Sequence, residues 1–405
     1  MTVNERFQPS SMDLIRAGLQ DLEASRRLFE QLKANGIPED RLQAVLDSLT
    51  NACDPDTALT NLVAIVNAAT SRGETLSGIM PDRQSFERMI TVLGVSDAMG
   101  KLMRFHPDLV QAASSDVDNT YLYNHAQRRA SMLHAIGADP DELDAPVAGL
   151  ELADAATALR GTYYRQLAAI MAQDATAPDP CIIQPTISRE LSDLADSALE
   201  GALAIARHEV EGSDHVRFVI IGMGKLGAQE LNYVSDVDLI YAVEPADDAI
   251  GNQELIRIGT KMGTTLQRVC QSVIMGVAAP ALWQIDGGLR PEGKDGSLVR
   301  TIESHKGYYE QWAESWEFQA LLKARPVAGD RALGQAYMDM TRPFVWSASK
   351  RDNFVYDCQQ MRKRVENLIA PPLKDREIKL GRGGLRDVEF TVQMLQLVHG
   401  RSDES

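Results

Sequence analysis

The sequence predicts a mostly helical α+β protein, and the distribution of apolar residues along the chain leads to that prediction. Up to Glu211 the apolar residues recur at helical spacing. Strands are expected only after these helices, at 216–221, from Asp236 onward and at 281–286. After Ser304 the spacing is again mostly helical. We therefore expect a small sheet between two helical parts.

The expected helices are bounded by residues that break helices. In the first hundred residues, short amphipathic helices packed on one another are separated where Gly and Pro occur, at 36–38, 54–55 and 72–73. A further helical pattern from 91 to 113 is cut at His106-Pro107, and the polar, turn-rich stretch 114–144 is expected to be a loop. Later helices are expected at 154–173, at 188–211 after a proline-containing linker over 174–185, at 253–275, and at 316–325 before Pro326.

Length and charge restrict the possible functions. A chain of 405 residues favours two to four packed units. Its 57 acidic and 41 basic side chains give a net charge of −16, which argues against a polymerase that grips DNA or RNA through the phosphates. The four cysteines form no CxxC, the first residues lack the pattern of a signal peptide, and no apolar run approaches ~18 residues. We expect a cytoplasmic protein that binds a protein or a nucleotide, with no nucleic acid and no membrane.

The stretch that carries most chemical information is Asp236-Val237-Asp238, at the start of an apolar run. Side chains at i and i+2 leave the same face of a strand, so two carboxylates would lie together, where a bound cation would stabilise them. A glycine-rich turn precedes them, with Gly224, Lys225 and Gly227 as candidates for binding phosphate oxygens through exposed N–H groups and a positive charge. The pattern predicts metal-assisted transfer of a nucleotidyl or phosphoryl group.

The same glycines also fit a dinucleotide-binding fingerprint. Gly222, Gly224 and Gly227 follow a predicted strand, and Glu244 lies about where a ribose-binding acid would lie. Against this alternative, the interval 225–234 barely accommodates a crossover helix, and no further alternation of strands and helices follows. Dinucleotide binding is therefore kept as the lesser interpretation.

Further candidates surround the aspartate pair. Asp286 ends the third predicted strand and would complete a set of oxygen ligands for hard cations, although Asp before Gly is also typical of a turn. Ser235 would donate to a phosphate oxygen or cap the turn before the strand. The cations that would balance anionic oxygens, each of which is alternatively an ordinary surface cation, are Lys225, Arg290, Lys323 and Arg325.

Four segments, in this order, resemble a known family, the bifunctional enzymes that adenylylate and deadenylylate glutamine synthetase. They are 222–240 (GMGKLGAQELNYVSDVDLI), 285–296 (IDGGLRPEGKDG), 316–330 (WEFQALLKARPVAGD) and 378–390 (IKLGRGGLRDVEF). The resemblance implies a polymerase-β-type nucleotidyltransferase core with a small mixed sheet. It implies an N-terminal helical domain over 1–150, a catalytic domain over 151–325 and a C-terminal helical domain over 326–405.

Members of this family carry two related halves, and the last segment is similar to the adenylyl-removing half, so we expect an N-terminal fragment or an isolated half. The resemblance implies that orthophosphate attacks the phosphorus that joins AMP to a tyrosine of glutamine synthetase, releasing ADP. Asp236, Asp238 and Asp286 would hold Mg²⁺ or Mn²⁺, as two ions, and the PII signalling protein would be the regulator. Two alternatives stay open: a regulatory module that binds PII or glutamine synthetase, and the forward, ATP-dependent adenylylation.

Overall fold

The structure is a computed structural model that describes residues 7–74, 83–114, 124–374 and 376–400. The chain forms two compact units. The first unit comprises Met1–Asn124 and Gly161–Leu194, and the second comprises His125–Arg160 and Ala195–Ser405. The chain passes from one unit to the other within two long helices, α9 (Leu152–Ala175) and α10 (Pro180–Glu209). The domain limits expected at 150 and 325 stay a prediction.

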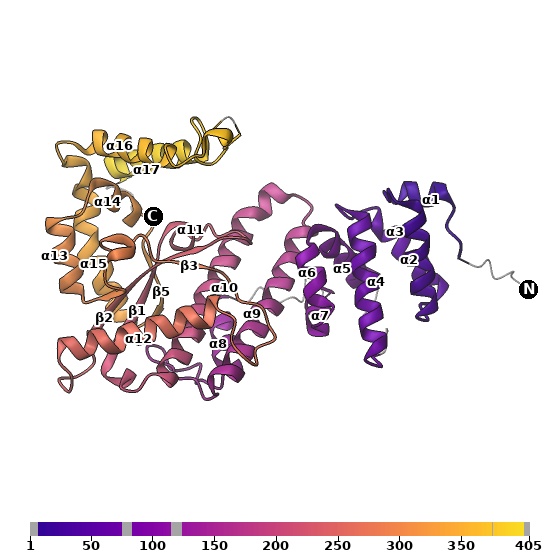
Figure 1. The fold of residues 1–405 in the computed structure, drawn as a ribbon, viewed down its shortest axis with the longest axis horizontal. Helices are drawn as coiled ribbons and strands as arrows, with labels where there is room; N and C mark the ends of the chain where they lie inside the picture. The colour runs from indigo at the N-terminus through magenta and orange to yellow at the C-terminus, as the bar shows by residue number, and fades with distance from the viewer. Residues whose placement is uncertain (1–6, 75–82, 115–123, 375, 401–405) are drawn as a thin grey trace, which may run out of the picture. The chain divides into compact units, whose positions relative to one another are not determined.

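The first unit begins with short helices, as predicted (Figure 1). The breaks at 36–38 and 72–73 fall between helices, and at 54–55 Asp54 caps α4, which begins at Pro55, by accepting a hydrogen bond from the Thr57 N–H. The pattern from 91 to 113 has one more break than expected, because Ser96 caps a new helix. These helices are α1 (Ser11–Arg16), α2 (Leu22–Ala34), α3 (Glu39–Leu49), α4 (Pro55–Ser71), α5 (Arg83–Val95), α6 (Asp97–Met103) and α7 (Pro107–Ser114).

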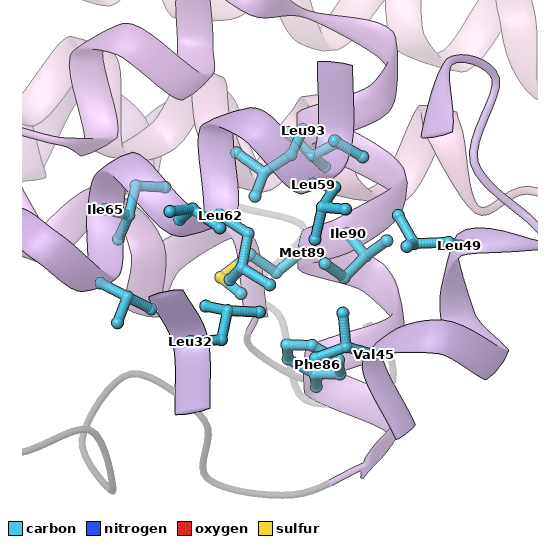
Figure 2. Close-up of a cluster of buried hydrophobic side chains, with 14 of the residues drawn as sticks. Leu32, Val45, Leu49, Leu59, Leu62, Ile65, Phe86, Met89, Ile90 and Leu93 are labelled. Atoms are coloured by element: carbon cyan, nitrogen blue, oxygen red, sulfur yellow. The ribbon is translucent and has the colours of Figure 1, made fainter. Parts of the chain in front are cut away.

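Apolar side chains from these helices form the core of the first unit. Figure 2 shows Leu59 and Leu62 of α4 beside Met89 and Ile90 of α5, and all four are fully buried. Burying a side chain of this size stabilises a fold by about 1.5–3 kcal/mol. Ala168 of α9 belongs to the same core. The apolar spacing of the sequence thus predicts the packing of this unit correctly.

Two predictions about the middle of the chain are wrong. The stretch 114–144, expected to be a loop, contains α8 (His125–Ala135), while 115–123 lie outside the described residues. The stretch is polar partly because it contains buried arginines. Arg129 is buried and donates to the carbonyl oxygens of Pro140 and Glu142, at 2.9 and 2.6 Å. The linker over 174–185 is also shorter than expected, because α10 begins at Pro180 and contains Pro185.

The second unit contains a mixed five-stranded sheet. Its strands are β1 (Val216–Gly222), β2 (Val237–Pro245), β3 (Ile285–Asp286), β4 (Val299–Arg300) and β5 (Arg325–Gly329). The order is β3-β2-β1-β5, and β4 also pairs with β2. β1 pairs antiparallel with β2 and β5, whereas β3 and β4 run parallel to β2. This sheet confirms the predicted small mixed sheet in a mostly helical chain, although 281–284 do not belong to β3.

Helices cover both faces of the sheet. One face packs against α12 (Asn252–Gln271), whose Gly259 lies against Val243 of β2. The other face, with Val219 and Ile240, forms a core with later helices. These helices are α13 (Ile302–Gln311), α14 (Ser315–Leu321), α15 (Arg331–Ser347), α16 (Phe354–Glu366) and α17 (Leu385–His399). α12 and α15 are labelled on either side of the strands in Figure 1.

The helix predicted at 316–325 ends early, which is a correction. α14 stops at Leu321, and Arg325 begins β5 with Pro326 as its second residue. Proline lacks the N–H that a central strand donates, but β5 lies at the edge of the sheet and its pairing with β1 shifts register at Ile220/Ile221. An edge strand with a bulge therefore accepts a residue that sequence reasoning took as a helix stop.

Among the described residues, none of the helices combines the length and the apolar character that spanning a lipid bilayer requires.

Candidate active site

The arrangement of the first two strands excludes the dinucleotide interpretation. β1 and β2 are antiparallel, whereas a dinucleotide-binding unit joins parallel strands through a crossover helix. The helix between them, α11 (Gly224–Gly227), is a single turn. Glu244, the candidate ribose ligand, accepts a hydrogen bond from the Ile302 N–H at 2.9 Å and so holds the start of α13.

The three predicted aspartates line one cavity of about 820 Å³. Asp238 lies in β2 directly opposite Asp286 in β3, so the parallel pairing of two strands brings these residues together. Asp236 lies one residue before β2, which begins at Val237 and not at Asp236 as predicted. The structure therefore brings the aspartates to one place, with Asp236 contributed by the segment that enters the strand.

The charge on Asp238 is only partly compensated. Burial, together with the negative charges of Asp286 and Asp236, raises the pKa of the Asp238 carboxyl from its usual value to about 6. The positive charges of Arg386 and Lys379 act in the opposite direction. A carboxylate whose neighbours include two others is costly to ionise, unless a cation lies between them.

Carboxylate oxygens are the type of donor that hard divalent cations prefer, but the spacing of the three aspartates limits how they could bind one. Asp236, Asp238 and Asp286 do not form a close ligand group. Their carboxylate oxygens do not all come within 4.8 Å of one another. The aspartates as they stand are thus spread too widely to chelate one ion together. Mg²⁺ is commonly bound through one or two carboxylates, with water and phosphate oxygens as its other ligands. The wider spacing is compatible with that mode, and the like charge around Asp238 is what a cation would offset.

Two glycines of the turn are required by close approaches. Gly224 has φ +56°, and a side chain at this position would clash with Oδ2 of Asp238. Gly227 packs against the backbone of the segment that precedes β5, where a side chain would clash with the carbonyl oxygen of Lys323. Gly224 lines the cavity and Gly227 does not. Gly227 therefore serves close packing and is not among the residues that could contact phosphate in this cavity.

Lys225 and Ser235 line the cavity as the sequence suggested. The Lys225 ammonium donates to Oδ1 of Asn232 at 2.9 Å, a neutral partner that leaves its charge uncompensated. The Ser235 hydroxyl donates to the carbonyl oxygen of Asp236 at 2.9 Å, and this bond holds the segment that enters β2.

The other predicted cations are not at the cavity, and this corrects the sequence analysis. Arg290 donates to the carbonyl oxygens of Gly287, Lys294 and Gly296, at 2.9, 2.9 and 3.2 Å. It thereby closes the loop that follows Asp286. Because its donors are used within this loop, Arg290 shapes the site and does not line it.

Arg325 and Lys323 also have protein partners. Arg325 forms two hydrogen bonds with the buried carboxylate of Asp196, at 2.6 and 3.1 Å, and donates to the carbonyl oxygen of Gly227 at 3.1 Å. Lys323 contacts Glu230 at 3.0 Å and Glu389 at 3.5 Å. Whether an arginine faces a ligand or a carboxylate depends on these tertiary partners, which spacing in the sequence does not specify.

Several residues without a predicted role also line the cavity. Lys379, Arg386 and Glu389 reach it from the turn before α17 and from the first part of that helix, and Trp283 reaches it from the segment before β3. Arg362 of α16 forms an ion pair with Asp387 and so joins α16 to α17.

Comparison with known proteins shows the family to which this chain belongs. Residues 86–340 match the family described as glutamate-ammonia ligase adenylyltransferase, and residues 357–403 match the family described as GlnD PII-uridylyltransferase. Three relatives carry the name bifunctional glutamine synthetase adenylyltransferase/adenylyl-removing enzyme. The protein of Bifidobacterium longum (strain DJO10A) is 75% identical over 98% of this chain and 37% of its own length.

The relative from Cutibacterium acnes (strain DSM 16379 / KPA171202) is 41% identical over 99% of this chain and 40% of its own length. The relative from Mycolicibacterium smegmatis (strain ATCC 700084 / mc(2)155) is 41% identical over 96% of this chain and 37% of its own length. The chain thus spans about two fifths of the length of these relatives. The residues 86–340 matched by the first family include Asp236, Asp238 and Asp286 and all five strands of the sheet. This chain belongs to the glutamate-ammonia ligase adenylyltransferase family.

Proposed function

We propose that this chain removes AMP from adenylylated glutamine synthetase by metal-dependent phosphorolysis, with a nucleotidyltransferase core of the polymerase-β type. The observation that carries the proposal is the cavity where Asp236, Asp238 and Asp286 meet beside the turn of α11. The relatives' name includes an adenylyl-removing activity, and the segment 378–390 resembles the half that performs it.

Three aspartates would hold the cofactor, Mg²⁺ or Mn²⁺, as two ions. When bound, these ions would neutralise the charge that develops on the attacking, transferred and leaving oxygens. Asp238 and Asp286 are held in place by the pairing of β2 with β3, and Oδ1 of Asp286 accepts a hydrogen bond from the Gly288 N–H at 2.8 Å. Two of the three proposed ligands are therefore held by the sheet and by the loop that follows β3.

In the proposed reaction, an oxygen of orthophosphate forms a bond to the phosphorus of AMP, and the bond from that phosphorus to the tyrosine oxygen breaks. The proton of hydrogen phosphate ends on the tyrosine oxygen, so the products are ADP and unmodified tyrosine. No side chain of this protein has to act as a nucleophile. The tasks of its residues are to orient two anions and to compensate their charge.

The substrate and the regulator are part of this proposal. Adenylylated glutamine synthetase is the substrate, in keeping with the relatives' name. The PII signalling protein is the proposed regulator, and the match of residues 357–403 to a PII-uridylyltransferase family supports it. The forward adenylylation of glutamine synthetase and a purely regulatory role are distinguished from deadenylylation by the products.

The experiment incubates the chain with adenylylated glutamine synthetase, Mg²⁺ and phosphate, and measures ADP by chromatography. A parallel reaction with unmodified glutamine synthetase and ATP measures pyrophosphate. We expect ADP in the first reaction, its loss in Asp238→Asn, and its retention in Asp248→Asn, an exposed aspartate beyond the far end of β2. Pyrophosphate without ADP would assign the forward reaction, and binding of the substrate without either product would assign a regulatory module.

A further inference from the structure

The cavity that the aspartates line also receives two cations from one turn. Lys379 lies in the turn before α17 and Arg386 is the second residue of that helix. The backbone joins them directly, because the Arg386 N–H donates to the carbonyl oxygen of Lys379 at 2.9 Å. Both side chains line the cavity with Asp238. Their position is thus set by the turn and not by two independent loops.

The two cations have donors to spare. No hydrogen bond or ion pair joins the Lys379 ammonium to any other residue that the structure describes. Arg386 uses one guanidinium nitrogen, Nη1, in a 2.7 Å bond to Glu389, and its guanidinium carbon lies 5.6 Å from the centre of the Phe390 ring. The stacked ring and the single carboxylate leave the remaining N–H groups of Arg386 available to an anion.

The cavity contains charges of both signs. The aspartates supply the negative charge, and Lys379 and Arg386 supply positive charge to the same cavity. Metal ions at the aspartates would attract the phosphate of AMP, but they do not provide a separate place for a second anion. The volume of about 820 Å³ has room for more than one phosphate.

We propose that Lys379 and Arg386 form a phosphate subsite that is separate from the metal-binding aspartates and receives the attacking orthophosphate. The inference rests on the proposed function for the identity of the anion, and on the geometry for its place. Phosphorolysis requires two anions to approach one another, and a cation pair in the same cavity offsets the repulsion between them. Arginine and lysine are suited to this task through bidentate and point-charge contacts with phosphate oxygens.

Glu389 is the positioning residue of this subsite. Its Oε2 accepts the bond from Arg386, and its Oε1 lies 3.5 Å from the Lys323 ammonium in the turn after α14. Glu389 therefore connects the α17 segment to the segment that leads into β5. Without this carboxylate we expect the Arg386 side chain to lose its fixed orientation, although the charge remains.

The test measures equilibrium binding of inorganic phosphate to the full chain by calorimetry, with and without AMP and Mg²⁺. We expect Arg386→Gln and Lys379→Ala each to weaken phosphate binding about 10-fold or more, as the loss of a charge-assisted hydrogen bond implies, while AMP binding with Mg²⁺ changes less than about 2-fold. Arg382→Gln is the matched control, since Arg382 is an exposed cation of the same turn that does not line the cavity. Glu389→Gln should weaken phosphate binding by a smaller factor without changing AMP binding.

Two outcomes of the binding measurements would overturn the inference. Either the unmodified chain shows no saturable phosphate binding, or the Arg386 and Lys379 variants weaken AMP and phosphate equally, which would assign the pair to the nucleotide. A lowered thermal midpoint together with weaker binding of both ligands would mark Glu389 as merely structural. Phosphate binding through the pair without any ADP formation would leave the subsite in place and refute the proposed function. ADP formation with an unchanged KM for phosphate in Arg386→Gln would support the proposed function and refute the subsite.

Discussion

Two acidic sites of the second unit differ in what surrounds their carboxylates. Asp196 is fully buried, yet it forms two hydrogen bonds with Arg325, so its negative charge is compensated within the protein. Asp238 is less buried, but its neighbours include Asp236 and Asp286, and its pKa rises to about 6 because of burial and these like charges. A compensated carboxylate holds the fold together, whereas an uncompensated cluster costs stability and is available for chemistry.

The largest effect should come from removing the uncompensated charge. We expect Asp238→Asn to lower phosphorolytic turnover by at least about 10³-fold, because it removes metal-binding charge at unchanged size. At neutral pH without metal ions, the free energy of unfolding of this variant should be about 1–3 kcal/mol higher than that of the unmodified chain, because like-charge repulsion is relieved. Turnover assays and urea unfolding in the presence of a chelator measure the two effects. An equally active variant would remove Asp238 from the site.

The opposite change is expected at the compensated pair. Arg325→Gln should lower the free energy of unfolding by about 3–5 kcal/mol, because it leaves the carboxylate of Asp196 buried without its guanidinium partner. Arg325 also donates to the carbonyl oxygens of Leu226 and Gly227, so the turn of α11 should loosen as well. Urea unfolding provides the measurement, and the double variant Asp196→Asn/Arg325→Gln should recover part of the loss. A loss below about 1 kcal/mol would contradict the importance of this pair.

The same contrast explains how far the sequence could predict the site. The aspartates were found because i and i+2 spacing before an apolar run, and a third acid at the end of a later strand, are local patterns that strand pairing brings together. Arg290 and Arg325 were assigned to phosphate although they bind carbonyl oxygens and Asp196, because only tertiary geometry decides which acceptor an arginine meets. Lys379, more than a hundred residues after the β2 aspartates, carried no local signal that it lines their cavity.

The fold was predictable to a similar extent. The core of the first unit follows from apolar spacing, and the strands β1 and β2 follow from their apolar runs. The two-residue strand β4 is too short to leave a pattern, and β5 contains a proline that favours a helix stop in sequence reasoning. Both strands exist because β2 and β1 offer them unpaired edges, which is information from the assembled sheet.

A buried histidine with an altered pKa lies outside the cavity and should make stability depend on pH. His305 of α13 is 1% exposed, and its pKa falls to about 4 because burial disfavours the charged ring and Arg300 adds a repulsive charge. An unfolded chain binds a proton near pH 6.5, which the folded chain does not bind until about pH 4. Stability should therefore be lost as the pH falls through this window, by about 3 kcal/mol at most.

Urea unfolding between about pH 7 and pH 4 tests this expectation against His305→Gln as the reference. The variant lacks the titrating group but keeps a donor for the carbonyl oxygen of Tyr241, which lies 3.3 Å from Nε2 of His305. The difference in unfolding free energy between the two proteins should change across the window. A difference that stays constant with pH would show that His305 is protonated equally in both states.

The smallest effect is expected for an ion pair in the solvent. Arg257 and Glu254 of α12 form an ion pair whose side chains are 48% and 43% exposed, in contrast to Asp196 and Arg325. Water already solvates both charges and salt screens their attraction, so the ion pair contributes little to the free energy of unfolding. We expect Arg257→Ala to leave the urea midpoint unchanged within error at moderate salt. A shift comparable to that of Arg325→Gln would mean that burial does not distinguish the two pairs, and the contrast between compensated and solvated carboxylates would have to be abandoned.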